Sequence, residues 1–141
     1  MKSSESNVFY LGDNNAAATS IKDSEAAITV YSQFILSFFN VLQKHDYSLC
    51  FRVKILMYDK IIQLPIDKSI RNSLRNYLLS NRPLNLTSHI DESVMKESIQ
   101  YVYDATCELF GPVKADEALS IAIRETQHLP EAVFFHPREL L

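Results

Sequence analysis

The chain has 141 residues, of which 47% are hydrophobic, 11% aromatic and 22% charged, with a formal net charge of -3 at pH 7. This length and apolar fraction are typical of one packed globular domain, and they exclude collagen-like, low-complexity and wholly disordered chains. Two glycines are too few for a dinucleotide fingerprint or a phosphate-binding loop, because each needs several backbone positions that only glycine occupies easily.

Residues 1–22 are mostly polar and are predicted to form a flexible leader. Within them, residues 8–11 make a short apolar patch that could dock on the domain or on a partner. The segment lacks the basic start and the long apolar region of a secretory signal. Cys50 and Cys107 lie in apolar stretches and are interpreted as reduced core thiols, so the expected location is the cytoplasm.

The first helix is predicted to begin at Asp23 or Ser24, either of which can cap free backbone amides, and to end near Lys44. Residues 26–43 carry no charge and reach the lower length limit of a membrane-spanning helix. Their polar side chains, however, gather on one side of the helix, and this pattern favours an amphipathic core helix. We therefore expect no membrane insertion.

A second helix is predicted over residues 48–64, with Asp46 as its cap, and a third from Asp67 to the break at residues 81–83. The second is apolar almost all round and should lie between neighbours. The stretch from Phe51 to Tyr58 also alternates as a strand would, so a short α+β alternative stays open.

A fourth helix is predicted from Ser88 or Asp91 to Gly111, where glycine suits a left-handed cap and the following proline can open the next helix. The fifth covers residues 113–128, and its alanines permit close approach to a neighbour. Together these signals predict an all-α fold, a single-domain four- or five-helix bundle over residues 23–141.

The charges are divided unevenly along the chain. Residues 44–82 hold eight basic and three acidic side chains, whereas residues 83–141 hold four basic and ten acidic ones. Opposite potentials can organise self-association or attract a partner. The basic middle also permits a helix-turn-helix interpretation, in which Lys68, Arg71 and Arg75 bind nucleic acid, although the acidic total charge and the apolar second helix weaken it.

Catalytic and metal-binding patterns are weak. Glu125 and His128 have the spacing found in di-metal bundles, but such a centre needs a second motif of this kind and two further glutamates. No Ser-centred elbow, HExxH motif or paired catalytic carboxylate is visible. We expect no catalytic residue, no cofactor and no metal.

The leading functional prediction is a non-catalytic protein-protein interaction module, such as an adaptor, an assembly factor or a chaperone-like subunit, that binds another protein or its own copy. It depends on the charge division and on the seven tyrosines and eight phenylalanines, since aromatic residues are enriched at interfaces. The C-terminal tail should anchor the partner and an acidic helical face should steer it, although the tail could equally fold back on the bundle. The expected partner-binding residues are Phe134, Phe135 and Leu140 in the tail and Glu97, Asp104 and Glu108 on the acidic face. The alternatives are a DNA-binding regulator and a small-molecule sensor with a pocket between the first, second and fourth helices.

Overall fold

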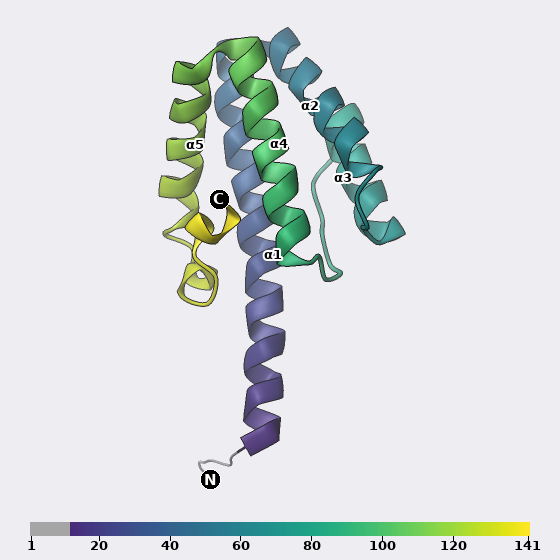
Figure 1. The fold of residues 1–141 in the computed structure, drawn as a ribbon, viewed down its shortest axis with the longest axis vertical. Coiled ribbons are helices and arrows are strands. Elements are labelled where there is room, and N and C mark those ends of the chain that lie inside the picture. Colours follow the sequence, from purple (N-terminus) through teal and green to yellow (C-terminus); the bar gives the residue numbers. More distant parts are fainter. Residues whose placement is uncertain (1–11) are drawn as a thin grey trace.

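A computed structural model describes the backbone of residues 12–141 and the side chains of residues 23–141. These residues form five α-helices and two short 3-10 helices, and no strand occurs in this described part (Figure 1). The all-α prediction is therefore confirmed. The elements are α1 (Gly12–His45), α2 (Tyr47–Ile61), α3 (Lys68–Ser80), α4 (Glu92–Phe110), α5 (Pro112–Thr126), η2 (Pro130–Val133) and η3 (Pro137–Leu140).

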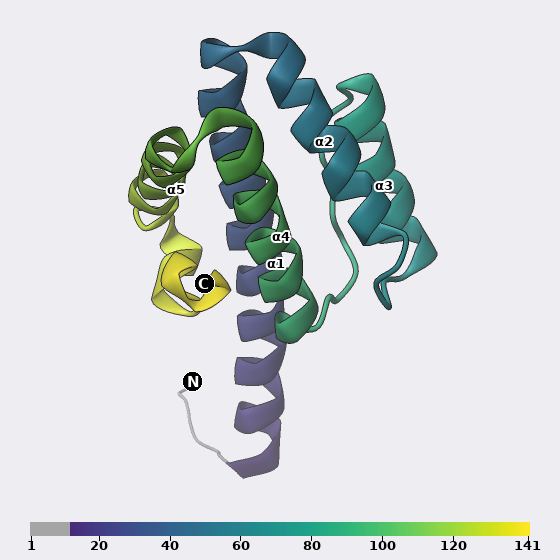
Figure 2. The same ribbon diagram turned by 45° about the horizontal axis from the view of Figure 1, so that its top comes forward.

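Four of the helices form the bundle and the fifth lies outside it. α1 packs against α2 and α5, and α4 packs against the same two helices from the opposite side. α3 packs on the outer side of α2, as Figures 1 and 2 show from two directions. The predicted bundle of four or five helices is thus a four-helix bundle with one added helix, α3. Within the bundle, α2 is the helix that contacts α3.

α1 is longer than the sequence pattern predicted. It begins at Gly12 and not at Asp23 or Ser24, so residues 12–22 are helical although they were assigned to the leader. No proline interrupts the segment, and it contains three consecutive alanines, the residue with the highest helix propensity. The first turns of α1 project beyond the end of the bundle (Figure 1). The apolar patch at residues 8–11 lies outside the described residues.

α2 resolves the helix-or-strand alternative at Phe51 to Tyr58, because all of this stretch is helical. The Asp46 carboxylate accepts a hydrogen bond from the Leu49 amide at 2.9 Å, which confirms the predicted cap. Buried residues recur every three to four positions along α2, and this helical period outweighs the short alternation. They are Cys50, Val53, Lys54, Met57 and Ile61.

The helix junctions follow the local signals in the sequence. Asn81 ends α3 in the left-handed conformation, with φ 55°, and the Arg82 amide donates back to the Asn76 carbonyl at 3.1 Å. Gly111 has φ 91°, a backbone conformation that suits glycine, and Pro112 opens α5 directly after it. The chain can therefore turn sharply between α4 and α5.

The core is centred on α1. Its largest side chains, among them Tyr31, Phe34 and Phe39, are fully buried. Ala115, Ala118 and Ala122 of α5 are 0% exposed, and their small side chains allow the extensive contact between α5 and α1. The window of residues 23–45 has the length and hydropathy of a membrane span, but 61% of it is buried inside the bundle, as in the core helix of a packed domain.

Candidate functional site

The C-terminal tail folds back onto the bundle. Phe135 is 5% exposed and Leu140 is 0% exposed, whereas Phe134 between η2 and η3 remains 49% exposed. The fold of η3 is fixed locally, because the His136 ring accepts from the Arg138 amide at 3.1 Å and the His136 amide donates to the Glu139 carboxylate at 3.2 Å. The anchor role expected for Phe135 and Leu140 is thus corrected, because both are core residues. Of the three expected anchors, Phe134 alone lies at the surface.

The three acidic residues expected to steer a partner do not act as one group. Glu97 forms an ion pair with Lys60 of α2, with 3.0 Å between Nζ and Oε2, and so helps to join α4 to α2. Asp104 and Glu108 come together along α4, where they line a shallow groove of about 470 Å³ beside Tyr101. Asp104 also accepts a hydrogen bond from Gln100 at 3.0 Å.

The three basic residues of the nucleic-acid alternative differ in their exposure to solvent. Lys68 and Arg75 are exposed on α3. Arg71 is half-buried, and its Nη2 donates to the Ile66 carbonyl at 3.2 Å, within the connection between α2 and α3. Its Nε is buried without a hydrogen-bond partner. Arg71 therefore supports the loop, and two of the three side chains remain at the surface.

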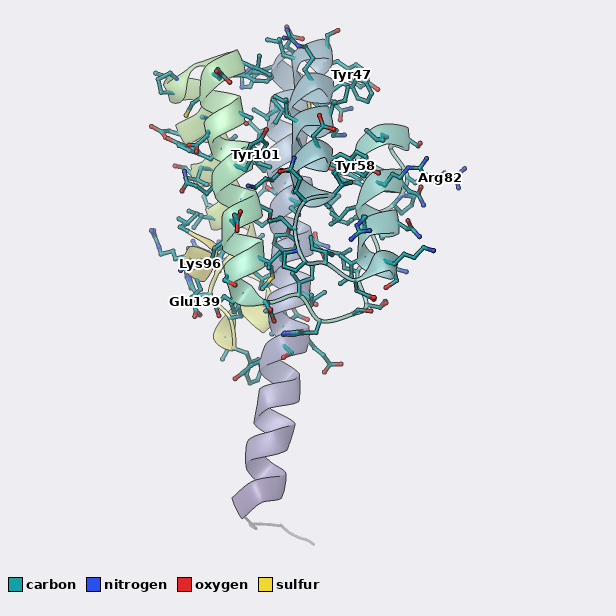
Figure 3. The ribbon with its side chains drawn as sticks, turned by 45° about the vertical axis from the view of Figure 1, so that its right-hand side comes forward. Tyr47, Tyr58, Arg82, Lys96, Tyr101 and Glu139 are labelled. Carbon is teal, nitrogen blue, oxygen red and sulfur yellow. The ribbon has the colours of Figure 1, made fainter. Side chains whose placement is uncertain are left out.

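An exposed apolar face on α2 is the feature that the sequence analysis missed. As its apolar sequence predicted, α2 lies between neighbours, since α1, α3 and α4 all contact it. One face nevertheless stays open, on which Tyr47 is 64%, Phe51 is 41%, Ile55 is 37% and Ile62 is 48% exposed. Half-buried Tyr58 completes the line, and Figure 3 shows Tyr47 and Tyr58 along the same helix. We call these five residues the α2 stripe.

The spacing of the α2 stripe was visible in the sequence. Its members follow one another at intervals of four, four, three and four residues, which places them on one side of a helix. The sequence alone could not identify this face as exposed, because α2 is apolar on other faces too. An almost uniformly apolar pattern does not indicate which face a neighbouring helix covers. Only the tertiary arrangement distinguishes the open face from the covered ones.

A pocket of about 340 Å³ adjoins the first turns of the α2 stripe. It lies between the ends of α1 and α3 and the start of α2. Tyr47 and Phe51 of the stripe belong to its wall. Its complete lining is Gln43, Tyr47, Cys50, Phe51, Lys54, Leu78, Leu79, Ser80 and Asn81.

Lys54 is the charged group of this pocket and is only 6% exposed. Its Nζ lies 4.8 Å from the centre of the Tyr77 ring and 5.6 Å from that of Phe39, so two aromatic faces support the ammonium. Within the described residues no carboxylate forms a salt bridge with it. Burial lowers the pKa of Lys54, and burial raises the pKa of the neighbouring Cys50 thiol.

The space between α1, α2 and α4, where the sensor alternative placed its ligand, is nearly filled. The cavity there measures about 10 Å³ and is lined by core residues such as Phe34, Met57 and Ile99. Ligand pockets are roughly 300 to 1,000 Å³, so a small molecule does not fit between these helices as they stand. Among the described residues, no three His, Cys, Asp or Glu side chains gather as metal ligands.

Comparisons with protein-family models, with curated proteins and with solved structures find no match for this chain.

Proposed function

We propose that this protein is a non-catalytic cytoplasmic interaction module that binds another protein through the α2 stripe. The exposure of four large apolar side chains on one helix face supports the proposal. A contiguous apolar patch is unfavourable in water and marks an interaction site in many proteins. Burying one such side chain completely contributes about 1.5 to 3 kcal/mol. The four side chains are already partly buried, at 37% to 64% exposure, so a partner that covers the stripe would gain about half of that contribution from each.

A helix of the partner is the natural occupant of such a surface. The stripe runs the length of α2, about 22 Å at 1.5 Å per residue, and its side chains repeat every three to four residues. A second amphipathic helix presents side chains at the same intervals and can interdigitate with them. The end of α3 lies beside the start of the stripe, because Leu78 and Leu79 line the same pocket as Tyr47 and Phe51. An adaptor, an assembly factor and a chaperone-like subunit all use binding of this kind.

The test compares Ile55→Asp with Val113→Asp. Ile55 is 37% exposed in the stripe, whereas Val113 is 79% exposed and belongs to α5. Figure 1 shows that α5 lies on the other side of the bundle from α3. Both variants place a charge on an exposed apolar position, and circular dichroism verifies that both stay helical. In affinity capture from native lysate, the wild type and Val113→Asp should retain the same protein, and Ile55→Asp should lose it. Equal recovery by all three proteins would show that the stripe is not the binding surface.

A DNA-binding regulator is the second candidate, and exposed Lys68 and Arg75 favour it. α3 carries three basic residues and no acidic one. Phosphate contacts would make such binding strongly dependent on salt. A gel shift with duplex DNA at 50 mM salt tests this candidate, with Lys68→Glu/Arg75→Glu as the variant expected to abolish the shift. No shift of the wild-type protein would exclude it.

A further inference from the structure

We propose that the partner segment is an acidic amphipathic helix, one side-chain carboxylate of which enters the pocket beside the α2 stripe and pairs with the Lys54 ammonium. This inference rests on the function proposed above, and it adds the chemistry of the partner. Two independent observations carry it. One is the charge around the stripe, and the other is the environment of Lys54.

The segment that carries the stripe is basic. The segment that contains α2 and α3, residues 44–82, holds eight basic and three acidic side chains. The basic side chains therefore outnumber the acidic ones by five, with each acid counted at full charge. Lys68, Arg75 and Arg82 are exposed on or just beyond α3. Carboxylates that flank the apolar side chains of a bound helix would meet this positive potential.

A second copy of this chain fits the same surface less well. In a two-fold symmetric dimer through the α2 stripe, each subunit would bring its own basic α2–α3 segment to the contact. Like charges would then face one another, which opposes association. A partner with an acidic helix avoids this repulsion, so charge favours it over self-association.

Lys54 supplies the second observation. Its side chain is buried and lines the pocket, and the described residues provide no carboxylate for it. The two aromatic rings and the C-terminal end of α3 offer partial negative charge, but neither replaces a counter-ion. An incoming carboxylate would form a charge-assisted hydrogen bond in a partly desolvated site, where such bonds are strong. Gln43, Ser80 and Asn81 supply further polar groups at the rim.

The experiment begins with a displayed library of helical peptides, selected against the full-length protein at low salt. We expect the enriched peptides to carry apolar residues at helical spacing and a net negative charge. The best sequence is then synthesised with an amidated C-terminus, so that its anionic groups are side-chain carboxylates. Its affinity is measured by fluorescence anisotropy, and each of its glutamates or aspartates is replaced in turn by the matching amide.

The expected pattern is a coupling between one peptide carboxylate and Lys54. One of the carboxylate-to-amide replacements should weaken binding of the peptide to the wild type roughly tenfold, because it removes one charged hydrogen bond. The same replacement should not change binding of the peptide to Lys54→Met. Lys96→Met is the matched control, because Lys96 is exposed on α4 (Figure 3), and it should retain the full effect of that replacement. The carboxylate-to-amide replacements in the peptide leave the protein unchanged. If Lys54→Met is unstable, they still identify the carboxylate that contributes to binding of the wild type.

The alternative outcomes are distinguishable. One of them is a selection that enriches neutral or basic peptides, which Ile55→Asp no longer binds. That result would overturn the proposal that the partner is acidic, and the stripe would still be a binding surface. An equal effect of every peptide replacement on wild type and Lys54→Met would overturn the role of the pocket. A doubled mass in light scattering that Ile55→Asp abolishes would identify a second copy as the occupant. If no peptide is enriched and Ile55→Asp captures the same proteins as wild type, the proposed function itself fails.

Discussion

The hydroxyls of Tyr31 and Ser98 meet inside the bundle and connect α1 to α4. Both residues are 1% exposed, and 2.7 Å separates their oxygen atoms. The Ser98 hydroxyl donates to the Met95 carbonyl at 2.8 Å, so the Tyr31 hydroxyl must donate to Ser98. Each buried hydroxyl proton therefore has an acceptor, as burial requires. Burial raises the pKa of Tyr31 to about 12.

Tyr31→Phe should lower the free energy of unfolding by about 1 kcal/mol at pH 7, because it removes this hydrogen bond and leaves Ser98 without its donor. The difference should depend on pH. The pKa of Tyr31 is about 12 in the folded protein and 10.0 ordinarily, so its contribution is complete below pH 10 and is lost as the pH rises toward 12. Urea unfolding at pH 7, 10 and 11 measures both effects. A constant difference between the two proteins across this range would contradict the assignment.

At the scale of the elements, the sequence predicted the features that local chemistry determines. The Asp46 cap, the break at Asn81 and the turn at Gly111 depend on a few neighbouring residues, and all three are confirmed. The open face of α2 and the folded tail depend on contacts between distant parts of the chain. Phe134 and Phe135 illustrate the limit, since two identical adjacent side chains end at 49% and 5% exposure. No local pattern separates them.

The same pair gives a direct test of the tail. Phe135→Ala should destabilise the protein by about 3 to 5 kcal/mol, because it removes a buried aromatic ring and leaves a cavity. Phe134→Ala should cost less than about 1 kcal/mol, since nearly half of that side chain is already in water. Chemical denaturation of the two variants beside the wild type measures the contrast. Similar losses for both would mean that the tail does not pack as the structure shows.

At the scale of the whole molecule, the charge division survives folding. Between the basic segment 44–82 and the acidic segment 83–141, Lys60 and Glu97 form an ion pair, and the His45 ring lies 3.7 Å from the Glu117 carboxylate. α3, which carries three basic residues, packs on α2 away from the acidic helix α5 (Figure 2). The basic residues of α3 and the acidic residues of α5 therefore lie on opposite sides of the bundle. The molecule keeps a basic α2–α3 side and acidic α4 and α5 helices, and an approaching partner experiences both.

This division predicts how fast an acidic partner binds. Arg52→Glu/Arg75→Glu reverses two exposed charges on α2 and α3, and Lys96→Glu/Arg124→Glu makes the same change in net charge on α4 and α5. Electrostatic steering can raise association rates tenfold or more at low salt. We therefore expect the first variant to bind the selected acidic peptide about tenfold more slowly in stopped-flow fluorescence, with a weaker dependence on salt. The second should stay close to the wild type, because its changes lie away from the stripe. Equal slowing by the two variants would mean that total charge, and not its distribution, governs the encounter.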